Sequence, residues 1–252
     1  MGAFAMTSTE TNLDATRAYY DEFSKGYERH RRPNDDRGYH AMLDDLEVDL
    51  VERYGRSADV LECGCGTGLI LERIARFAKT AKGIDLSPGM LELAQQRGLD
   101  VCEGSVTDLP FDDATFDVTC SFKVLAHVPE IGRALREMAR VTRPGGVILA
   151  EFYNPVSFRG LAKTLGPAGK ISAQGTKESA VYTRFDPPWV LPRILPPGTK
   201  VETIRGVRIV TPAAAFWKVP GLRTALRWAE TALADTRAAY LAGFYVAVIR
   251  KS

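Results

Sequence analysis

Metal-binding cysteine patterns and apolar runs of membrane-spanning length are both missing from this sequence of 252 residues. Its four cysteines form no CxxC pair and have no histidine at zinc-ligand spacing, which argues against a structural metal site. We therefore expect free thiols in a reducing compartment and no bound metal. The cysteines are Cys63, Cys65, Cys102 and Cys120.

Signals for export and for nucleic-acid binding are scarce as well. Residues 1–6 lack the basic region and the long apolar core of a signal peptide, so we expect a cytoplasmic protein. A natural start at Met6 is an alternative to one at Met1. The chain contains no internal repeat, no low-complexity tract, no glycine-arginine tract and no lysine-rich run, which argues against RNA as a partner.

Charge is unevenly distributed, although the whole chain carries only +2. Residues 151–252 contain 15 Lys and Arg against 6 Asp and Glu, whereas residues 1–150 contain 18 against 25. A basic C-terminal part favours an anionic substrate, an acidic membrane surface or nucleic acid as its partner. The alternative is intramolecular, with the basic part facing the acidic part.

The most informative stretch is DVLECGCGTG at residues 59–68. A short apolar run ends at Glu62, three glycines alternate, and helical spacing runs from Leu69 to about Phe77, which predicts a strand, a tight turn and a helix. Such a loop can hold a pyrophosphate or a smaller group against its peptide groups. The dinucleotide pattern is G-x-G-x-x-G, whereas this one is E-x-G-x-G-x-G. Glu62 would repel a pyrophosphate and attract an ammonium group, which favours S-adenosylmethionine, a cofactor with an ammonium, a sulfonium and a ribose but no phosphate.

A second acid stands at the end of the next predicted strand. Asp85 follows Gly68 by 17 residues, and Ser87 and Pro88 then predict the cap and first turn of a helix. In a doubly wound sheet this carboxylate would face the ribose hydroxyls of a nucleotide in the crevice. A diol would gain two charge-assisted hydrogen bonds from it.

Strands alternate with helices along the chain, which predicts an α/β protein with a parallel sheet. We expect N-terminal lid helices at 1–57 and an S-adenosylmethionine-binding core at 58–153. A cap or substrate insertion, rich in glycine and proline, follows at 154–198, and the C-terminal part of the sheet at 199–252. Insertions of this length form lids or specificity regions, or else linkers.

Two expected helices carry specific predictions. The segment 14–32 places Tyr20, Phe23 and Tyr27 on one face, which either closes over a site or belongs to the core. The segment 221–234 is expected to bury its leucines and one alanine. These are Leu222, Leu226, Ala229 and Leu233.

Taken together, the motifs resemble those of class I S-adenosylmethionine-dependent methyltransferases, in the small-molecule branch (methyltransferase type 11-like). The resemblance rests on VLECGCGTG, GIDLSPGML, SVTDLPF, FDVTCSFKVLAHVP and RVTRPGG, which occur in the family's order and spacing, and it covers residues 58–152 closely. It implies a Rossmann-like seven-stranded, mostly parallel sheet with strand order 3-2-1-4-5-7-6, strand 7 antiparallel, and a helical lid or cap. It also implies S-adenosyl-L-methionine as the cofactor.

The same resemblance implies a set of cofactor-binding residues. Glu62 and the glycines would hold the methionine end, Asp85 the ribose, and the residues after Asp85 the adenine. Ser105 and Val106 stand where the family often has an acid and a small residue beside the adenine amino group, which is a departure. The full set is Tyr20, Tyr27, Glu62, Cys63, Gly64, Cys65, Gly66, Gly68, Asp85, Leu86, Met90, Ser105, Val106 and Phe122.

The acceptor side is predicted from the fourth motif, the lid and the cap. His127 is a candidate base, because an unperturbed imidazole titrates near neutrality, with loop ordering or pocket lining as the alternative. Tyr20 is a second candidate catalytic residue, since the resemblance places the lid near the sulfonium and the nucleophile. Lys123 either meets an anionic substrate or is salt-bridged. The expected substrate-binding residues are Lys123, His127, Tyr153, Arg184 and Trp189.

These observations favour an S-adenosylmethionine-dependent methyltransferase that acts on a small molecule. We expect O-, N- or C-methylation of an apolar or aromatic acceptor, with an anionic or lipid-like acceptor as one version of this prediction. We also expect a monomer or a homodimer, and no binding of DNA. The aromatic residues of the cap either close on such an acceptor or form the cap's own core. An RNA or protein methyltransferase and a non-catalytic cofactor-binding or interaction protein are the alternatives.

Overall fold

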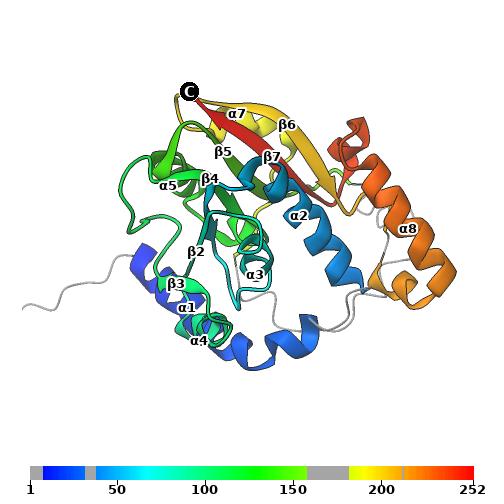
Figure 1. Ribbon diagram of the computed structural model, residues 1–252, viewed down its shortest axis with the longest axis horizontal. Coiled ribbons are helices and arrows are strands. Elements are labelled where there is room, and N and C mark those ends of the chain that lie inside the picture. Colours follow the sequence, from blue (N-terminus) through cyan, green and yellow to red (C-terminus); the bar gives the residue numbers. More distant parts are fainter. Residues whose placement is uncertain (1–7, 32–37, 158–181, 212) are drawn as a thin grey trace, which may run out of the picture.

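A single seven-stranded sheet runs through the computed structural model, which describes residues 8–31, 38–157, 182–211 and 213–252 (Figure 1). The strands are β1 (Asp59–Cys63), β2 (Thr80–Asp85), β3 (Asp100–Glu103), β4 (Phe116–Ser121), β5 (Thr142–Tyr153), β6 (Thr199–Val207) and β7 (Phe244–Lys251). Their spatial order is β3-β2-β1-β4-β5-β7-β6, and only β7 runs antiparallel to its neighbours. The predicted strand order and the antiparallel last strand are confirmed.

Helices cover both faces of the sheet. The α-helices are α1 (Ser8–Arg31), α2 (Tyr39–Gly55), α3 (Leu71–Ile74), α4 (Pro88–Gln96), α5 (Ile131–Val141), α7 (Leu191–Ile194) and α8 (Pro220–Leu233). Short 3-10 turns are η1 (Leu125–His127), η4 (Pro188–Val190), η5 (Ala214–Lys218) and η6 (Arg237–Leu241). Among the described residues, no helix has the length and apolar character needed to cross a membrane.

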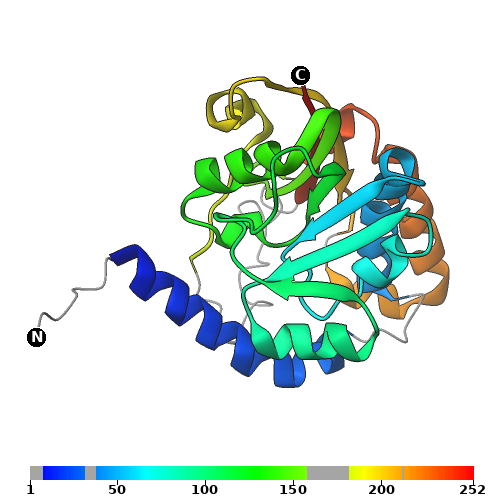
Figure 2. The same cartoon turned by 60° about the vertical axis from the view of Figure 1, so that its left-hand side comes forward.

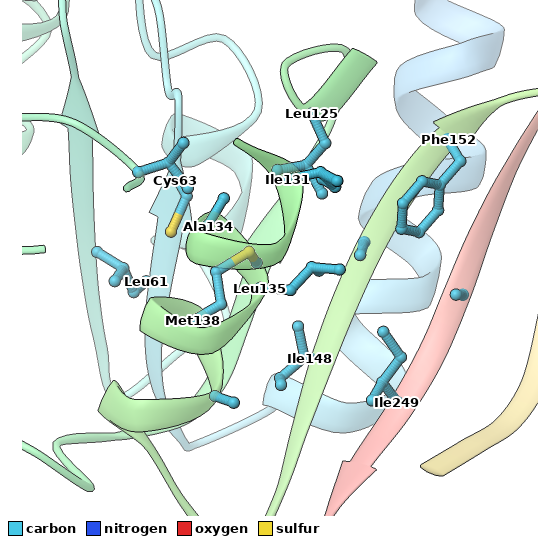
Figure 3. Close-up of a cluster of buried hydrophobic side chains, with 14 of the residues drawn as sticks. Leu61, Cys63, Leu125, Ile131, Ala134, Leu135, Met138, Ile148, Phe152 and Ile249 are labelled. Atoms are coloured by element: carbon cyan, nitrogen blue, oxygen red, sulfur yellow. The ribbon is translucent and has the colours of Figure 1, made fainter. Parts of the chain in front are cut away.

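The sheet separates two hydrophobic layers, because successive side chains of a strand point to opposite faces. On β5, Ile148 and Phe152 belong to the cluster that contains Met138 of α5 (Figure 3). Val147 and Leu149 of the same strand belong to the other cluster, with the apolar side chains of α2. Burial on both faces explains why residues 147–150 of β5 and residues 244–249 of β7 form continuous apolar runs.

Two helices near the cofactor motifs have other bounds than the sequence predicts. The first begins at Ser8 rather than at residue 14. The helix after the glycine loop is only α3, Leu71–Ile74, and does not extend from 69 to 77. Beyond it the N–H groups of Arg76 and Phe77 bond to the carbonyls three residues back, at 3.3 and 3.1 Å, so the chain tightens into turns instead of continuing as a helix.

Helix α8 buries a polar residue that the pattern of leucines does not indicate. Leu222, expected on the buried side, is 38% exposed, whereas Glu230 is fully buried. The Glu230 carboxylate accepts the N–H groups of Ile209, Val210 and Thr211 at 2.6, 3.0 and 2.8 Å. The prediction for Leu222 is wrong because the helix is oriented by these three hydrogen bonds as well as by apolar burial.

Several basic residues of the C-terminal part pair with acids of α2. Arg205 Nη1 lies 2.8 Å from Asp49 Oδ2, and Arg227 pairs with Asp45. Part of the positive charge of residues 151–252 is therefore neutralised by acids of residues 1–150, as the intramolecular alternative predicts. Residues 158–181 of the predicted cap lie outside the described residues.

Helix α1 lies along α4 at one end of the molecule (Figures 1 and 2). Its Asp21 carboxylate accepts the Ser87 hydroxyl at 2.5 Å and the Gly89 N–H at 3.0 Å. Ser87 is the N-cap of α4 and also accepts the Met90 N–H, so Asp21 sits at the positive end of that helix. Helix α1 is thereby anchored at the N-terminus of α4.

Candidate active site

A cavity of about 740 Å³ lies where the carboxyl ends of β1, β2, β4 and β5 meet α1. This edge of a parallel sheet is where α/β proteins bind ligands. Most of the residues predicted from the sequence lie on its wall. They are Tyr20, Tyr27, Glu62, Gly64, Cys65, Gly66, Asp85, Leu86, Met90, Ser105, Val106, Phe122, Lys123, His127 and Tyr153.

Four predicted residues lie outside the cavity wall. Cys63 is fully buried in the core, and Gly68 allows the loop to approach α4, because a Cβ there would lie 2.3 Å from Leu99 Cδ1. Arg184 is held by Asp186 through two hydrogen bonds of 2.6 and 2.7 Å. Trp189 is 61% exposed.

The glycine loop brings bare backbone to the cavity. Gly64 has a φ of +78° and passes so close to the next loop that a Cβ would lie 2.2 Å from Val124 Cγ2. Gly66 has a φ of +54°, with open space where a side chain would stand. A ligand can therefore lie directly against the peptide groups at Gly66.

Glu62 ends β1 at the floor of this cavity and is only 2% exposed. Its Oε2 atom is buried, and no donor among the described residues bonds to it. Burial, helped by the nearby Glu47 carboxyl, raises the pKa of Glu62 well above its usual range. An unpartnered buried carboxyl oxygen is costly, and a cationic donor in the cavity would relieve that cost.

Asp85 ends β2 and is held rigidly. Its Oδ2 accepts the Gly66 N–H at 2.8 Å and its Oδ1 accepts the Ser87 N–H at 3.0 Å. Burial raises its pKa, against the pull of these backbone donors. Each carboxylate oxygen has a further lone pair, so the group can also accept two hydroxyl donors.

A charged cluster lies beside Glu62. Lys123 Nζ donates to Glu47 Oε2 at 2.6 Å and to Asp44 Oδ1 at 3.2 Å, and its backbone N–H donates to Glu151 Oε1 at 3.2 Å. Burial opposes charge on this lysine, but Glu47 and Asp44 raise its pKa above the usual value. Lys123 has a φ of +61°, in the left-handed region that few side chains adopt. Lys123 is therefore salt-bridged in the structure, which is the alternative to the prediction that it meets an anionic substrate.

His127 follows β4 in η1 and is oriented by a carbonyl. Its Nδ1 lies 3.0 Å from the Tyr182 carbonyl oxygen, and its ring packs edge-on against Tyr153 with centroids 5.8 Å apart. A carbonyl only accepts hydrogen bonds, so Nδ1 carries the proton and Nε2 remains an acceptor. That tautomer can take up a proton at Nε2.

The aromatic face of α1 forms part of the cavity wall. Tyr20, Phe23 and Tyr27 all lie on that wall, and the Phe23 and Tyr27 rings meet edge to face at 5.5 Å. Burial raises the pKa of both tyrosines, so their hydroxyl groups stay protonated and can donate hydrogen bonds. These rings therefore line the cavity, and the prediction that they close over a ligand stays a prediction.

At the adenine side of the predicted site, hydroxyl groups stand where the family often has an acid. Ser105 Oγ and Thr107 Oγ1 lie 2.7 Å apart, and both residues line the cavity. The Thr107 N–H donates to Ser105 Oγ at 3.2 Å, which holds the turn. Thr107 was not among the predicted site residues, although its hydroxyl is only two positions from Ser105.

Sequence reasoning also missed a polar group at the other end of the cavity. Arg31 Nη2 donates to both oxygens of Asp44 at 2.6 and 2.7 Å, and Arg31 Nη1 lies 3.1 Å from His40 Nδ1. Arg31 and His40 line the cavity. No local pattern connects these residues, since the arginine ends α1 and the other two belong to α2.

The comparisons with known proteins agree with this geometry. Residues 61–150 match the family model described as a methyltransferase domain. In structure, the chain is similar to an S-adenosylmethionine-dependent methyltransferase of Thermotoga maritima, with a TM-score of 0.66 and 20% identity over 94% of this chain and 99% of that one. Residues 61–150 thus match a methyltransferase domain, and the chain has the fold of S-adenosylmethionine-dependent methyltransferases, so the resemblance seen in the sequence is confirmed.

Relatives in sequence cover a smaller part of the chain. A demethylmenaquinone methyltransferase of Mycobacterium marinum is 42% identical over 107 residues, which are 42% of this chain and 46% of the relative. A malonyl-[acyl-carrier protein] O-methyltransferase of Serratia marcescens is 39% identical over 92 residues, 36% of each chain. The matched part thus spans less than half the length of these relatives.

Proposed function

We propose that this chain transfers a methyl group from S-adenosylmethionine to a small-molecule acceptor. The observation that carries the proposal is the buried, unpartnered Oε2 of Glu62, which shares a cavity with the open Gly66 and the rigid Asp85. A cofactor with an ammonium group and a ribose diol fits these groups. One with a pyrophosphate does not, because both acids would repel it.

The cofactor would be held by residues of β1, β2 and their loops. The Glu62 carboxylate would accept hydrogen bonds from the ammonium group, and Asp85 would accept hydrogen bonds from the ribose hydroxyls. Leu86 and Met90 would pack against the adenine. Further contacts come from Tyr20, Tyr27, Gly64, Cys65, Gly66, Ser105, Val106 and Phe122, which line the same cavity. When bound, S-adenosylmethionine supplies a methyl group on a positively charged sulfur, which is a good leaving group.

The protein's own part in the reaction is to align the acceptor, to exclude water and to remove a proton. Tyr20 and Tyr27 close the cavity from α1 and donate hydrogen bonds from neutral hydroxyls. His127 accepts the acceptor's proton at Nε2, because its Nδ1–H is already committed to the Tyr182 carbonyl. Tyr153 packs against the imidazole and keeps it in that orientation.

The acceptor we propose is an apolar or aromatic small molecule that is methylated at oxygen, nitrogen or carbon. The concave cavity beside α1 supports this class over RNA, whose recognition requires an extended surface. The names of the sequence relatives, which concern demethylmenaquinone and malonyl-[acyl-carrier protein], support it too.

Calorimetric titration with S-adenosylhomocysteine, the demethylated product, tests the cofactor site. We expect the wild-type protein to bind it and Asp85→Asn to bind roughly 10- to 100-fold more weakly, because one carboxylate oxygen that accepts charge-assisted hydrogen bonds is lost. Asp100→Asn, an exposed acid at the start of the adjacent strand, is the matched control and should bind like the wild type. A folded wild-type protein that binds neither the cofactor nor its product would refute the function.

A second measurement addresses the reaction itself. Incubation with methyl-labelled cofactor and a panel of small aromatic and carbonyl acceptors should transfer label to at least one of them. His127→Gln should reduce the turnover number much more than the affinity for the cofactor. Transfer to RNA alone would instead support the nucleic-acid alternative.

A further inference from the structure

Two histidines line the cavity, and their hydrogen bonds set opposite tautomers. His127 donates from Nδ1 to a carbonyl. His40, the second residue of α2, has its Nδ1 3.1 Å from Arg31 Nη1. Arginine can only donate hydrogen bonds, so His40 Nδ1 must accept and the ring proton must reside on Nε2.

The orientation of Arg31 is itself fixed. Its side chain is 9% exposed, and Asp44 binds it with both carboxylate oxygens, at 2.6 and 2.7 Å. This bidentate pair leaves Nη1 directed at His40. The contacts from Asp44 to Arg31 and from Arg31 to His40 therefore place the imidazole proton on Nε2 of a ring that lines the cavity.

His40 stays uncharged at physiological pH. Burial, together with the positive charge of Arg31, lowers its pKa to about 4. Lys123 and Arg208 act in the same direction, and Asp44 is the acid that opposes them. The group that faces the cavity is thus a neutral imidazole that donates from Nε2.

Apart from Glu62, which the proposed function assigns to the ammonium group of the cofactor, the described residues on this part of the wall offer donors rather than acceptors. Among the described residues the structure shows no partner for His40 Nε2, and Arg31 Nε is buried without one. The Tyr27 hydroxyl is a further donor, since burial raises its pKa. The carboxylates of Asp44 and Glu47 do not line the cavity, and they pair with Arg31 and Lys123. A ligand atom that accepts hydrogen bonds is suited to this wall, and an ammonium group is not.

We propose that His40 Nε2–H binds an oxygen atom of the methyl acceptor, so that the acceptor is a phenol, enol or carboxylate compound and not an amine. The inference rests on the proposed function and narrows its acceptor class. A neutral imidazole can stabilise negative charge on such an oxygen without giving up its proton. His40 is then a specificity-determining residue, while His127 remains the proton acceptor.

Binding of two probes to the protein saturated with S-adenosylhomocysteine tests the proposal. The probes are 1-naphthol and 1-naphthylmethylamine, which share the ring system but present an oxygen or an ammonium group. We expect the wild-type protein to bind 1-naphthol about tenfold more tightly, the equivalent of one hydrogen bond. Equal affinity for the two probes, or no binding of 1-naphthol, would overturn the proposal.

Two substitutions of His40 test its Nε2 donor and its Nδ1 acceptor separately. His40→Asn keeps an oxygen near the Nδ1 position for Arg31 but removes the donor at Nε2, and should lose about tenfold in affinity for 1-naphthol. His40→Gln places an amide N–H near Nε2 and should recover most of it. Both should bind S-adenosylhomocysteine as the wild type does, which separates this test from that of the function itself. Unchanged 1-naphthol affinity in His40→Asn would contradict the assignment.

The tautomer can be observed directly by nitrogen NMR of the imidazole rings, with the His40 signals identified by their loss in His40→Asn. We expect a neutral ring protonated at Nε2 down to about pH 5, and a shift of the Nε2 resonance when 1-naphthol is added. A charged ring at neutral pH, or a proton on Nδ1, would refute the proposal independently of the affinity measurements.

Discussion

The buried position of the Glu62 side chain lowers the stability of the folded protein at neutral pH. Glu62 is buried, and its Oε2 has no donor among the described residues. Because burial raises its pKa in the folded state above the usual value near 4.5, the folded protein retains a proton that the unfolded chain releases. Its contribution to stability is therefore full below about pH 4.5 and is lost as the pH rises. A group kept in this state is typical of a ligand site.

Replacing Glu62 by Gln should remove this pH-dependent cost. At pH 8 and without ligand, we expect Glu62→Gln to raise the free energy of unfolding by about 1 to 2 kcal/mol, and at pH 4 to change it little. The same variant should lose affinity for S-adenosylhomocysteine. Urea titrations at both pH values measure the difference, and Glu92→Gln, on the exposed side of α4, is the control. A less stable Glu62→Gln at pH 8 would contradict the argument.

Helices α1 and α4 are joined beside the cavity by an acidic side chain at the N-terminus of α4. Helix α1 is 24 residues long and reaches α4 through Asp21, whose carboxylate accepts from Ser87 and Gly89 at the α4 N-terminus. The hydrogen bond from Ser87 lowers the pKa of Asp21 below its usual value. The contact is therefore complete at neutral pH and weakens only as the pH falls through that lowered value. Since α1 also carries Tyr20 and Tyr27, this contact holds α1 where its two tyrosines line the cavity.

Loosening this contact should speed the release of ligand. We expect Asp21→Asn to raise the dissociation rate of S-adenosylhomocysteine roughly three- to tenfold, because a charge-assisted hydrogen bond at a helix N-terminus is weakened. Stopped-flow competition measures this rate. Glu22→Gln is the matched control, because Glu22 is exposed and contacts Lys25 on the same helix. If both variants release ligand at the wild-type rate, Asp21 does not hold the lid.

In the whole molecule, the C-terminal part is fastened to the sheet by a buried acid. The Glu230 carboxylate of α8 accepts three consecutive backbone N–H groups after β6, and Arg205 joins β6 to Asp49 of α2. Helix α8 itself presents Trp228, 74% exposed, to the surface, so apolar burial contributes little on that side. The polar bonds are thus a main link between α8 and the rest of the fold.

Loss of the Glu230 carboxylate should destabilise the protein without affecting the cofactor site. We expect Glu230→Ala to lower the free energy of unfolding by about 3 kcal/mol, because three buried N–H groups lose their acceptor, and Glu230→Gln to lower it less. Affinity for S-adenosylhomocysteine should be retained, since Glu230 lies outside the cavity. Glu202→Ala, at a half-buried ion pair with Arg250, is the control and should cost about 1 kcal/mol or less. A loss below 1 kcal/mol in Glu230→Ala would refute this role.

Local features of the sequence were enough to predict the sheet and the end of the cavity that contains Glu62 and Asp85. Glycines at alternate positions, the acid before them and the acid that ends the next strand are local features, and in a doubly wound sheet the carboxyl ends of adjacent strands meet at one edge. Glu62, Gly66 and Asp85 were therefore brought together by strand order alone.

The pairing of the buried charges, and with it the proposed acceptor end of the cavity, depends on contacts between elements that are far apart in the sequence. Arg31 finds Asp44 across 13 residues, and Lys123 finds the same acid across 79. A buried charge requires a partner, but nothing in the local sequence says which one, because the choice depends on how two helices and a strand end approach each other. The tautomers of His40 and His127, and with them the proposed preference for an oxygen acceptor, follow from those contacts.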